Sequence, residues 1–276
     1  ISIYNTINIY GVKFMEKNQN YNRTEIKKLL MLAILAGKTM LKNGAETYRA
    51  EDTIQRICKS RNNIKYADAF VTPTGIFASL EFEGEMITYL IRVKSTKIDL
   101  NMINLVNEFS RKFVNSNMSI DDGLARLSEI DKINNYNLSI KALFGSMASG
   151  FFCLLFGGTI YDFISTYSVS LIVLLFLNKI SKLEMTFFIN NFIGAALASI
   201  LSIFSIKMGL GENMDTIIIA SIMPLVPGVA ITNALRDTIS GDFLSGLSRT
   251  MEAIFSALAI AFGVGIVLNI YFKGLI

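Results

Sequence analysis

The 276-residue sequence contains no histidine, and it has only two cysteines and three prolines. Without histidine the chain cannot build a Ser-His-Asp triad, a Cys-His pair or a histidine-ligated metal site. The two cysteines fit neither a disulfide framework nor a zinc site, so Cys58 and Cys153 are expected to be buried small apolar residues. The sequence therefore predicts no catalytic centre of these kinds, no metal site and no cofactor.

Charge is scarce in the second half of the chain. Residues 1–140 hold 19 Lys and Arg against 15 Asp and Glu, whereas residues 141–276 hold only 7 of each. The mean hydropathy is +0.46 and 52% of the residues are hydrophobic. This division predicts a water-soluble domain fused to a membrane domain. The net charge of +4 is modest and the basic residues alternate with acids, so nothing favours nucleic-acid binding.

The first residues lack the charged region and the clean apolar core of a signal peptide. Met15 follows them and precedes a polar stretch, so we expect translation to start there and residues 1–14 to be upstream sequence or a tail. We expect a tail over residues 1–22, a cytoplasmic domain over 23–135 and a transmembrane domain over 136–276.

The first domain shows a helix pair, three strands and a second helix pair. Thr24 can cap the first helix and Asn43-Gly44 can end it, while Pro73 and Gly84 suit the turns between the strands. The pattern predicts an α+β fold with an antiparallel sheet. The expected helices are Thr24–Leu41, Ala45–Arg61, Leu100–Asn115 and Ser119–Ile130, and the expected strands are Lys65–Thr72, Ile76–Phe82 and Met86–Val93.

The second expected helix carries a dense polar face. Residues spaced three, seven and ten positions from Glu46 share one side, and Asp52 can pair with Arg56 at i+4. The simplest interpretation is a solvated face with weak ion pairs. The alternative is a surface that contacts the membrane half or a partner, formed by Glu46, Tyr48, Arg49, Glu51, Asp52 and Arg56.

The second domain holds five runs without charge. A membrane span needs about 20 residues, and Lys179 and Lys182 can extend the short second run to the headgroups. The loops rich in Lys and Arg all fall on one side, which predicts a cytoplasmic N-terminal domain and a C-terminus outside the plasma (inner) membrane. The sequence therefore predicts an all-α domain of five spans, over 142–161, 163–178, 185–206, 216–235 and 253–272.

Two of the three prolines interrupt the fourth run. Pro224 and Pro227 each remove a backbone donor and are expected to break this span near its middle, with Gly228 completing the hinge. The freed carbonyls need protein or water as partners. A new half-helix can begin near Val229, and its positive N-terminal end would favour a carboxylate.

Polar residues gather after this break and on the next span. Charges at such depth normally face a cavity or each other, which suggests a transport site. For Asp237 and Asp242, a location at the cytoplasmic interface is an equal alternative. The expected substrate-binding residues are Thr232, Asn233, Arg236, Ser245 and Arg249, and the expected proton-coupling residues are Asp237, Asp242 and Glu252.

Several motifs occur in one order along the chain. They are "NGAETYRAEDTIQRI", "VTPTGI", "KIDL", "LVNEFSR", "LLFGG", "NNFIGA" and "PGVAITNALRDTISGDFLSGLSRTMEA". Over residues 25–270 they resemble the threonine/serine exporter family, including its split two-protein form proposed to export succinate.

This resemblance implies a cytoplasmic domain, five spans and secondary-type export of small carboxylate metabolites. Fused family members continue into a second, smaller membrane domain, whereas this sequence stops at Ile276. The resemblance thus implies the larger component of the split form and a separate small membrane partner, and we also expect oligomerisation. Threonine or serine and a dicarboxylate such as succinate both stay open as substrates. The competing hypotheses are a membrane-anchored enzyme that uses the Glu46–Asp52 face and a sensor or assembly role for the soluble domain.

Overall fold

The computed structural model describes residues 21–61, 64–94, 96–133, 136–180 and 185–275. These residues form two compact units. The first runs to Ile133 and includes Ile239–Ser245, while the second comprises Asn134–Thr238 and Gly246–Ile276. Most of the predicted tail, with Met15, lies outside the described residues, as does Lys182. The predicted boundary between residues 135 and 136 stays a prediction.

The first unit has the predicted order of helix pair, three strands and helix pair. The strands form one antiparallel sheet in the order β1-β2-β3, as the short turns predicted. Its helices are α1 (Arg23–Lys42), α2 (Thr47–Cys58), α3 (Leu100–Asn115) and α4 (Ile120–Asp131), and its strands are β1 (Ile64–Thr72), β2 (Gly75–Phe82) and β3 (Glu85–Arg92).

The ends of these helices follow local side-chain chemistry. The prediction that Thr24 caps α1 is wrong, because Asn22 accepts from Glu25 N at 2.9 Å and Glu25 accepts from Asn22 N at 2.9 Å, which completes a reciprocal capping box. At the other end Gly44 has φ +91°, which confirms the predicted left-handed stop. Ser119 caps α4 as predicted.

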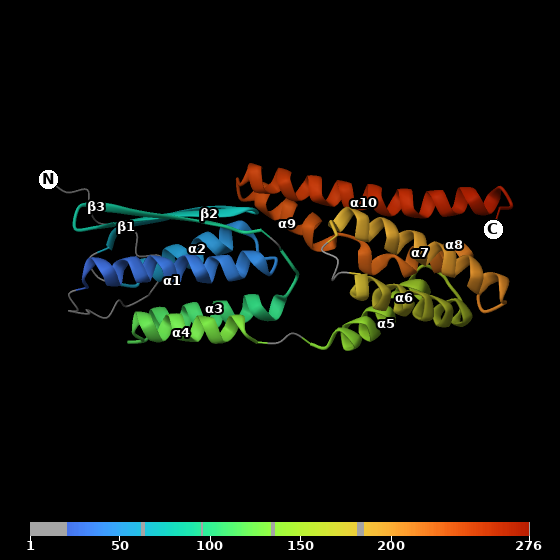
Figure 1. Cartoon of the computed structure of the whole chain (residues 1–276), viewed down its shortest axis with the longest axis horizontal. Helices are drawn as coiled ribbons and strands as arrows, with labels where there is room; N and C mark the ends of the chain where they lie inside the picture. The colour runs from blue at the N-terminus through green and yellow to red at the C-terminus, as the bar shows by residue number, and fades with distance from the viewer. Residues whose placement is uncertain (1–20, 62–63, 95, 134–135, 181–184, 276) are drawn as a thin grey trace. The chain divides into compact units, whose positions relative to one another are not determined.

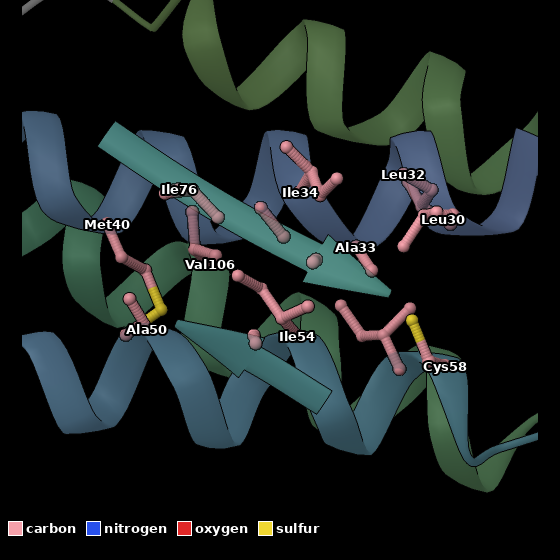
Figure 2. Packing of buried hydrophobic residues seen from close by; sticks show 14 of the residues in the cluster. Leu30, Leu32, Ala33, Ile34, Met40, Ala50, Ile54, Cys58, Ile76 and Val106 are labelled. Carbon is pink, nitrogen blue, oxygen red and sulfur yellow. The ribbon is translucent and has the colours of Figure 1, made fainter. Parts of the chain in front are cut away.

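Helix α1 is the centre of the first unit's core. Figure 1 shows it between the sheet and the α3–α4 pair, and Figure 2 shows Ile34, Ile54 and Cys58 directed toward the same interior. Burial raises the pKa of the Cys58 thiol to about 12. Cys58 is therefore a buried apolar residue, as predicted, and not a reactive thiol.

The second unit contains long apolar helices. Four of its helices are long and apolar enough to cross a membrane, and there are five if the bent pair α8–α9 counts as one span. The helices are α5 (Leu138–Leu155), α6 (Ile160–Ile180), α7 (Phe187–Lys207), α8 (Met214–Ser221), the short 3-10 turn η2 (Met223–Leu225), α9 (Gly228–Ile239) and α10 (Phe243–Phe272).

Serine hydroxyls form hydrogen bonds with one another between these apolar helices. Ser149 and Ser170 lie 2.9 Å apart on α5 and α6, and Ser205 of α7 donates to Ser165 of α6 at 2.9 Å. Small hydroxyl residues let helices approach closely while their polar atoms find partners within the protein.

A buried carboxylate holds the loop between α7 and α8 against α6. Asp162 Oδ1 accepts from the backbone N–H groups of Glu212 and Asn213 at 2.7 and 2.9 Å. Its Oδ2 accepts from Asn213 Nδ2 at 2.9 Å and from Thr159 N and Oγ1 at 2.9 and 3.1 Å. Five donors therefore compensate a side chain of zero exposure.

Replacing this carboxylate should destabilise the second unit. Asp162→Ala leaves several buried donors without an acceptor, so we expect a loss on the order of 3 kcal/mol in the free energy of unfolding. Thermal unfolding of the purified full chain in detergent measures this as a lowered midpoint. Asp215→Ala is the matched control, because Asp215 is an exposed acid in the first turn of α8. Equal midpoints for the two variants would contradict the structural role of Asp162.

Candidate functional site

The chain breaks where two prolines stand. Helix α8 ends at Ser221, the turn η2 holds Pro224, and α9 begins at Gly228, directly after Pro227. The two segments are bent by 57° at this break. Pro224 and Pro227 both lack a backbone N–H to donate, which explains why helix α8 does not continue through residues 222–227. The predicted half-helix after the break is present, and it starts one residue earlier than Val229.

A buried ion pair joins α9 to α10. Arg249 Nε lies 3.0 Å from Asp237 Oδ2, and the two side chains are only 10% and 0% exposed. Removing either partner would leave an uncompensated buried charge, which is strongly destabilising in an apolar surrounding. Charges at this depth were expected to face a cavity or each other, and the structure pairs these two.

Two further predicted polar residues are buried on the same two helices. Asn233 precedes Asp237 by one helical turn on α9, and Ser245 precedes Arg249 by one turn on α10. Their exposures are 5% and 2%. Because residues four apart share a helix face, the inward face of α9 carries an amide and a carboxylate, and that of α10 a hydroxyl and a guanidinium.

A glycine sets the approach of α10 to α9 between these residues. A Cβ atom at Gly246 would lie 2.1 Å from Thr238 Oγ1 and 3.1 Å from the carbonyl oxygen of Ala234. Thr238 Oγ1 is held in place because it donates to that same carbonyl at 2.8 Å. The backbones therefore approach more closely than any other residue at position 246 would permit.

Other predicted site residues lie on exposed faces. Thr232 donates to the carbonyl oxygen of Gly228 in its own helix at 2.9 Å, a common arrangement for a threonine in an apolar helix. Arg236 and Glu252 are exposed, on α9 and α10 respectively. These three side chains are therefore exposed, whereas Asn233, Asp237 and Arg249 are buried.

Asp242 belongs to the first unit and contacts its second helix. Thr47 is fully buried in the first turn of α2, and its Oγ1 donates to Asp242 Oδ2 at 3.2 Å. Helix α2 has no acidic residue in its own first turn and no side-chain hydrogen bond from its N-cap Glu46. The carboxylate of Asp242 therefore lies where the positive end of the α2 dipole favours a negative charge.

The predicted contact face of α2 divides into side chains of different character. Glu46 is 4% exposed and pairs with Arg49 at 3.3 Å. Glu51 Oε1 accepts from the backbone N–H of Val71 at 2.8 Å, so it satisfies an edge-strand donor. The exposed remainder of the face consists of Tyr48 and the ion pair Asp52–Arg56.

Sequence reasoning missed three residues with clear structural roles. Thr47, Asp162 and Gly246 each act through a partner that lies in another element. Only Asp162 carried a signal, because a lone acid at the start of an apolar span needs a buried partner. Across the described ranges no group of three His, Cys, Asp or Glu residues could hold a metal ion.

Comparison with known proteins identifies relatives along nearly the whole chain. A family model described as "Putative threonine/serine exporter" (ThrE) matches residues 31–271. A "Probable succinate transporter subunit YjjP" of Klebsiella aerogenes is 23% identical over 92% of this chain and 97% of its own length. The protein of the same name in Escherichia coli is 23% identical over 88% of this chain and 94% of its own.

A longer relative is the "Probable threonine/serine exporter" of Mycobacterium tuberculosis, 20% identical over 86% of this chain and 45% of its own length. This chain thus spans about half of that protein. No solved structure matches. The match of the family model over most of the sequence establishes that the chain belongs to the threonine/serine exporter family.

Proposed function

We propose that the chain is a component of a plasma-membrane exporter of small carboxylate metabolites and not a membrane-anchored enzyme. The observation that carries the proposal is the buried Asp237–Arg249 pair beyond a helix break. Buried charges within apolar helices mark substrate and proton pathways, and broken helices build binding sites in many transporters.

The pair favours a zwitterionic amino acid as substrate. The carboxylate of threonine or serine would replace Asp237 on Arg249 as a bidentate partner, and its ammonium would replace Arg249 on Asp237. Both buried charges then stay compensated, as burial requires. A dicarboxylate such as succinate brings no cation for Asp237, so it fits this pair less well. Asn233 and Ser245 would donate or accept hydrogen bonds, and Thr232 and Arg236 would act on the approach to the pair.

Proton coupling follows from the same chemistry. A proton on Asp237 and the substrate's ammonium group would compete for one carboxylate, and this mutual exclusion is what exchange of an exported amino acid for an entering proton requires. Asp242 and Glu252 are further acids that could relay the proton. Pro224, Pro227 and Gly228 would serve as the hinge between the two segments of the broken span.

We also propose a membrane topology and an assembly for this chain. The first unit lies in the cytoplasm, five spans follow with α8–α9 as one broken span, and the C-terminus lies outside. The relatives named as transporter subunits support a companion membrane subunit. We propose such a companion and an oligomeric assembly for this chain as well.

Variants of Arg249 and Asp237 should separate substrate binding from proton coupling. Arg249→Ala should lower threonine efflux from loaded cells by at least about tenfold, since a charge-assisted hydrogen bond contributes about 1.5–3 kcal/mol. Asp237→Asn should retain slow efflux that no longer responds to collapse of the pH gradient. Efflux is measured with the chain alone and with the companion subunit.

Asp215→Asn serves as the control, because it removes an exposed acid of α8 with the same change in charge as Asp237→Asn. Full efflux by correctly inserted Arg249→Ala protein, in both pairings, would refute the proposed site. Efflux by Asp237→Asn that still follows the pH gradient would refute only the coupling role.

Close packing of the two helices gives an independent prediction. Gly246→Ala forces α10 away from Thr238 and Ala234, which should lengthen the Asp237–Arg249 contact and lower efflux severalfold. Gly265→Ala is the matched control on the same helix, because nothing lies within 4 Å of a Cβ atom there. Efflux and insertion are measured for both variants, and equal efflux would show that the close approach is not needed.

The contact between α2 and Asp242 suggests that the cytoplasmic domain controls transport. Thr47→Val should lower the efflux rate severalfold without changing the affinity for threonine, and Asp242→Asn should do the same. If the hydrogen bond carries the effect, the double variant should be no slower than either single variant. Thr53→Val is the matched control in α2. Additive losses in the double variant would argue against a shared contact.

A further inference from the structure

A pocket that contains neither Asp237 nor Arg249 lies in the second unit, and its lining is mainly apolar with three polar side chains. It has a volume of about 290 Å³ and is formed where α5 begins, α6 ends and α7 begins. This volume is near the lower end of the range found for small-molecule pockets. Its lining residues are Leu138, Lys141, Ala142, Leu174, Leu177, Asn178 and Asn190.

Two leucines of α6 fix the walls of this pocket. Leu174 packs on Gly145 of α5, where an added Cβ would lie 3.0 Å from its Cδ1. Leu177 packs on Gly194 of α7 at a corresponding 2.8 Å. Because each leucine fills the space left by a missing side chain, the three helices are held close together one turn beyond Lys141 and Asn190.

The polar groups of the pocket are two amides and one cation. The carbonyl oxygen of Asn190 is buried and accepts no hydrogen bond. A buried acceptor of this kind normally has a partner, because leaving it without one costs about 1–3 kcal/mol. Lys141 supplies a positive charge, and none of the described residues that line the pocket is an acid. Lysine is common at the ends of membrane spans, which explains the position of Lys141. It does not explain the buried oxygen of Asn190, which accepts no hydrogen bond.

The helix ends add to the positive potential of the pocket. Helices α5 and α7 both begin there, with 18 and 21 residues respectively, and the N-terminal end of a helix favours negative charge. Thr186, the N-cap residue of α7, makes no side-chain capping hydrogen bond. An anion in this pocket would therefore meet Lys141 within one turn of the positive ends of two helix dipoles.

We propose that this pocket binds a small 2-amino or 2-hydroxy carboxylate. Lys141 and the helix ends hold the carboxylate, and the buried oxygen of Asn190 accepts a hydrogen bond from the neighbouring ammonium or hydroxyl group. A molecule of this class has a negative charge, a hydrogen-bond donor next to it and a small volume. It therefore matches the cation, the buried acceptor and the size of the pocket together.

The pocket adjoins the broken span through one residue. The Cβ position of Gly194 lies 3.0 Å from Leu225 Cδ1 as well as close to Leu177, and Leu225 belongs to the turn between α8 and α9. Leu177, which lines the pocket, and Leu225 of the break thus both pack on Gly194. Resting on the proposed transport function, the pocket is a second substrate site that precedes the Asp237–Arg249 pair.

Equilibrium binding of labelled L-threonine to the purified full chain in phosphatidylcholine nanodiscs tests the pocket. The wild-type chain should bind two threonine molecules. Lys141→Gln and Asn190→Leu should each weaken one site by at least about tenfold, as expected for loss of a charged or a buried hydrogen bond. Lys179→Gln is the matched control, because this exposed lysine lies next to Asn178 but does not line the pocket.

The Arg249→Ala variant separates the pocket from the proposed transport site. If Arg249→Ala binds one threonine and the double variant with Asn190→Leu binds none, the result supports the pocket. This holds even if efflux does not depend on Arg249. A wild-type chain that binds no threonine, binding by Arg249→Ala that survives the addition of Asn190→Leu, or pocket variants with wild-type stoichiometry and unchanged melting, would overturn the proposal. Retention of phosphatidylglycerol through Lys141 in native mass spectrometry, without threonine binding, would overturn it in favour of a lipid headgroup.

Discussion

The cost of placing charge in an apolar surrounding is the constraint that organises the second unit. Asp237 and Arg249 are almost completely buried, and the 3.0 Å contact places the two opposite charges side by side. Their contact requires that α9 and α10 lie close together, and Gly246 permits this by having no side chain. The break at Pro224 and Pro227 lets α9, which carries Asp237, run at an angle of 57° to α8. Hinge, glycine and ion pair thus depend on one another.

The first unit depends on burial of apolar surface, as a water-soluble domain does. Helix α1 is enclosed by the sheet, by α2 and by the α3–α4 pair, and its side chains supply much of the buried core. The polar residues of α2 are used differently. Glu51 satisfies a strand donor and Thr47 binds Asp242, so part of what resembled a solvated face holds the unit together.

Local patterns allowed most of the fold to be predicted from the sequence. The strand limits, the end of α1 at Asn43-Gly44 and the break at the two prolines all depend on residues close together in the chain. The sequence did not reveal which residues meet across long separations. Thr47 and Asp242 are 195 positions apart, and Asp162 finds its donors 50 and 51 positions away. For the same reason the sequence could not distinguish the exposed Thr232, Arg236 and Glu252 from the buried pair.

Asp162 and Asp237 are buried carboxylates of the second unit with different partners. Asp162 suits a permanent structural role, and Asp237 suits a site where a ligand binds and leaves. Asp162 accepts from five donors of Thr159, Glu212 and Asn213, all of which belong to the protein. No single ligand group could replace so many donors at once, so this carboxylate holds the loop permanently. Asp237 instead faces a cation. A zwitterion can enter between two opposite charges and leave both compensated, which is the property that a site must have if it binds and releases an amino acid within a membrane.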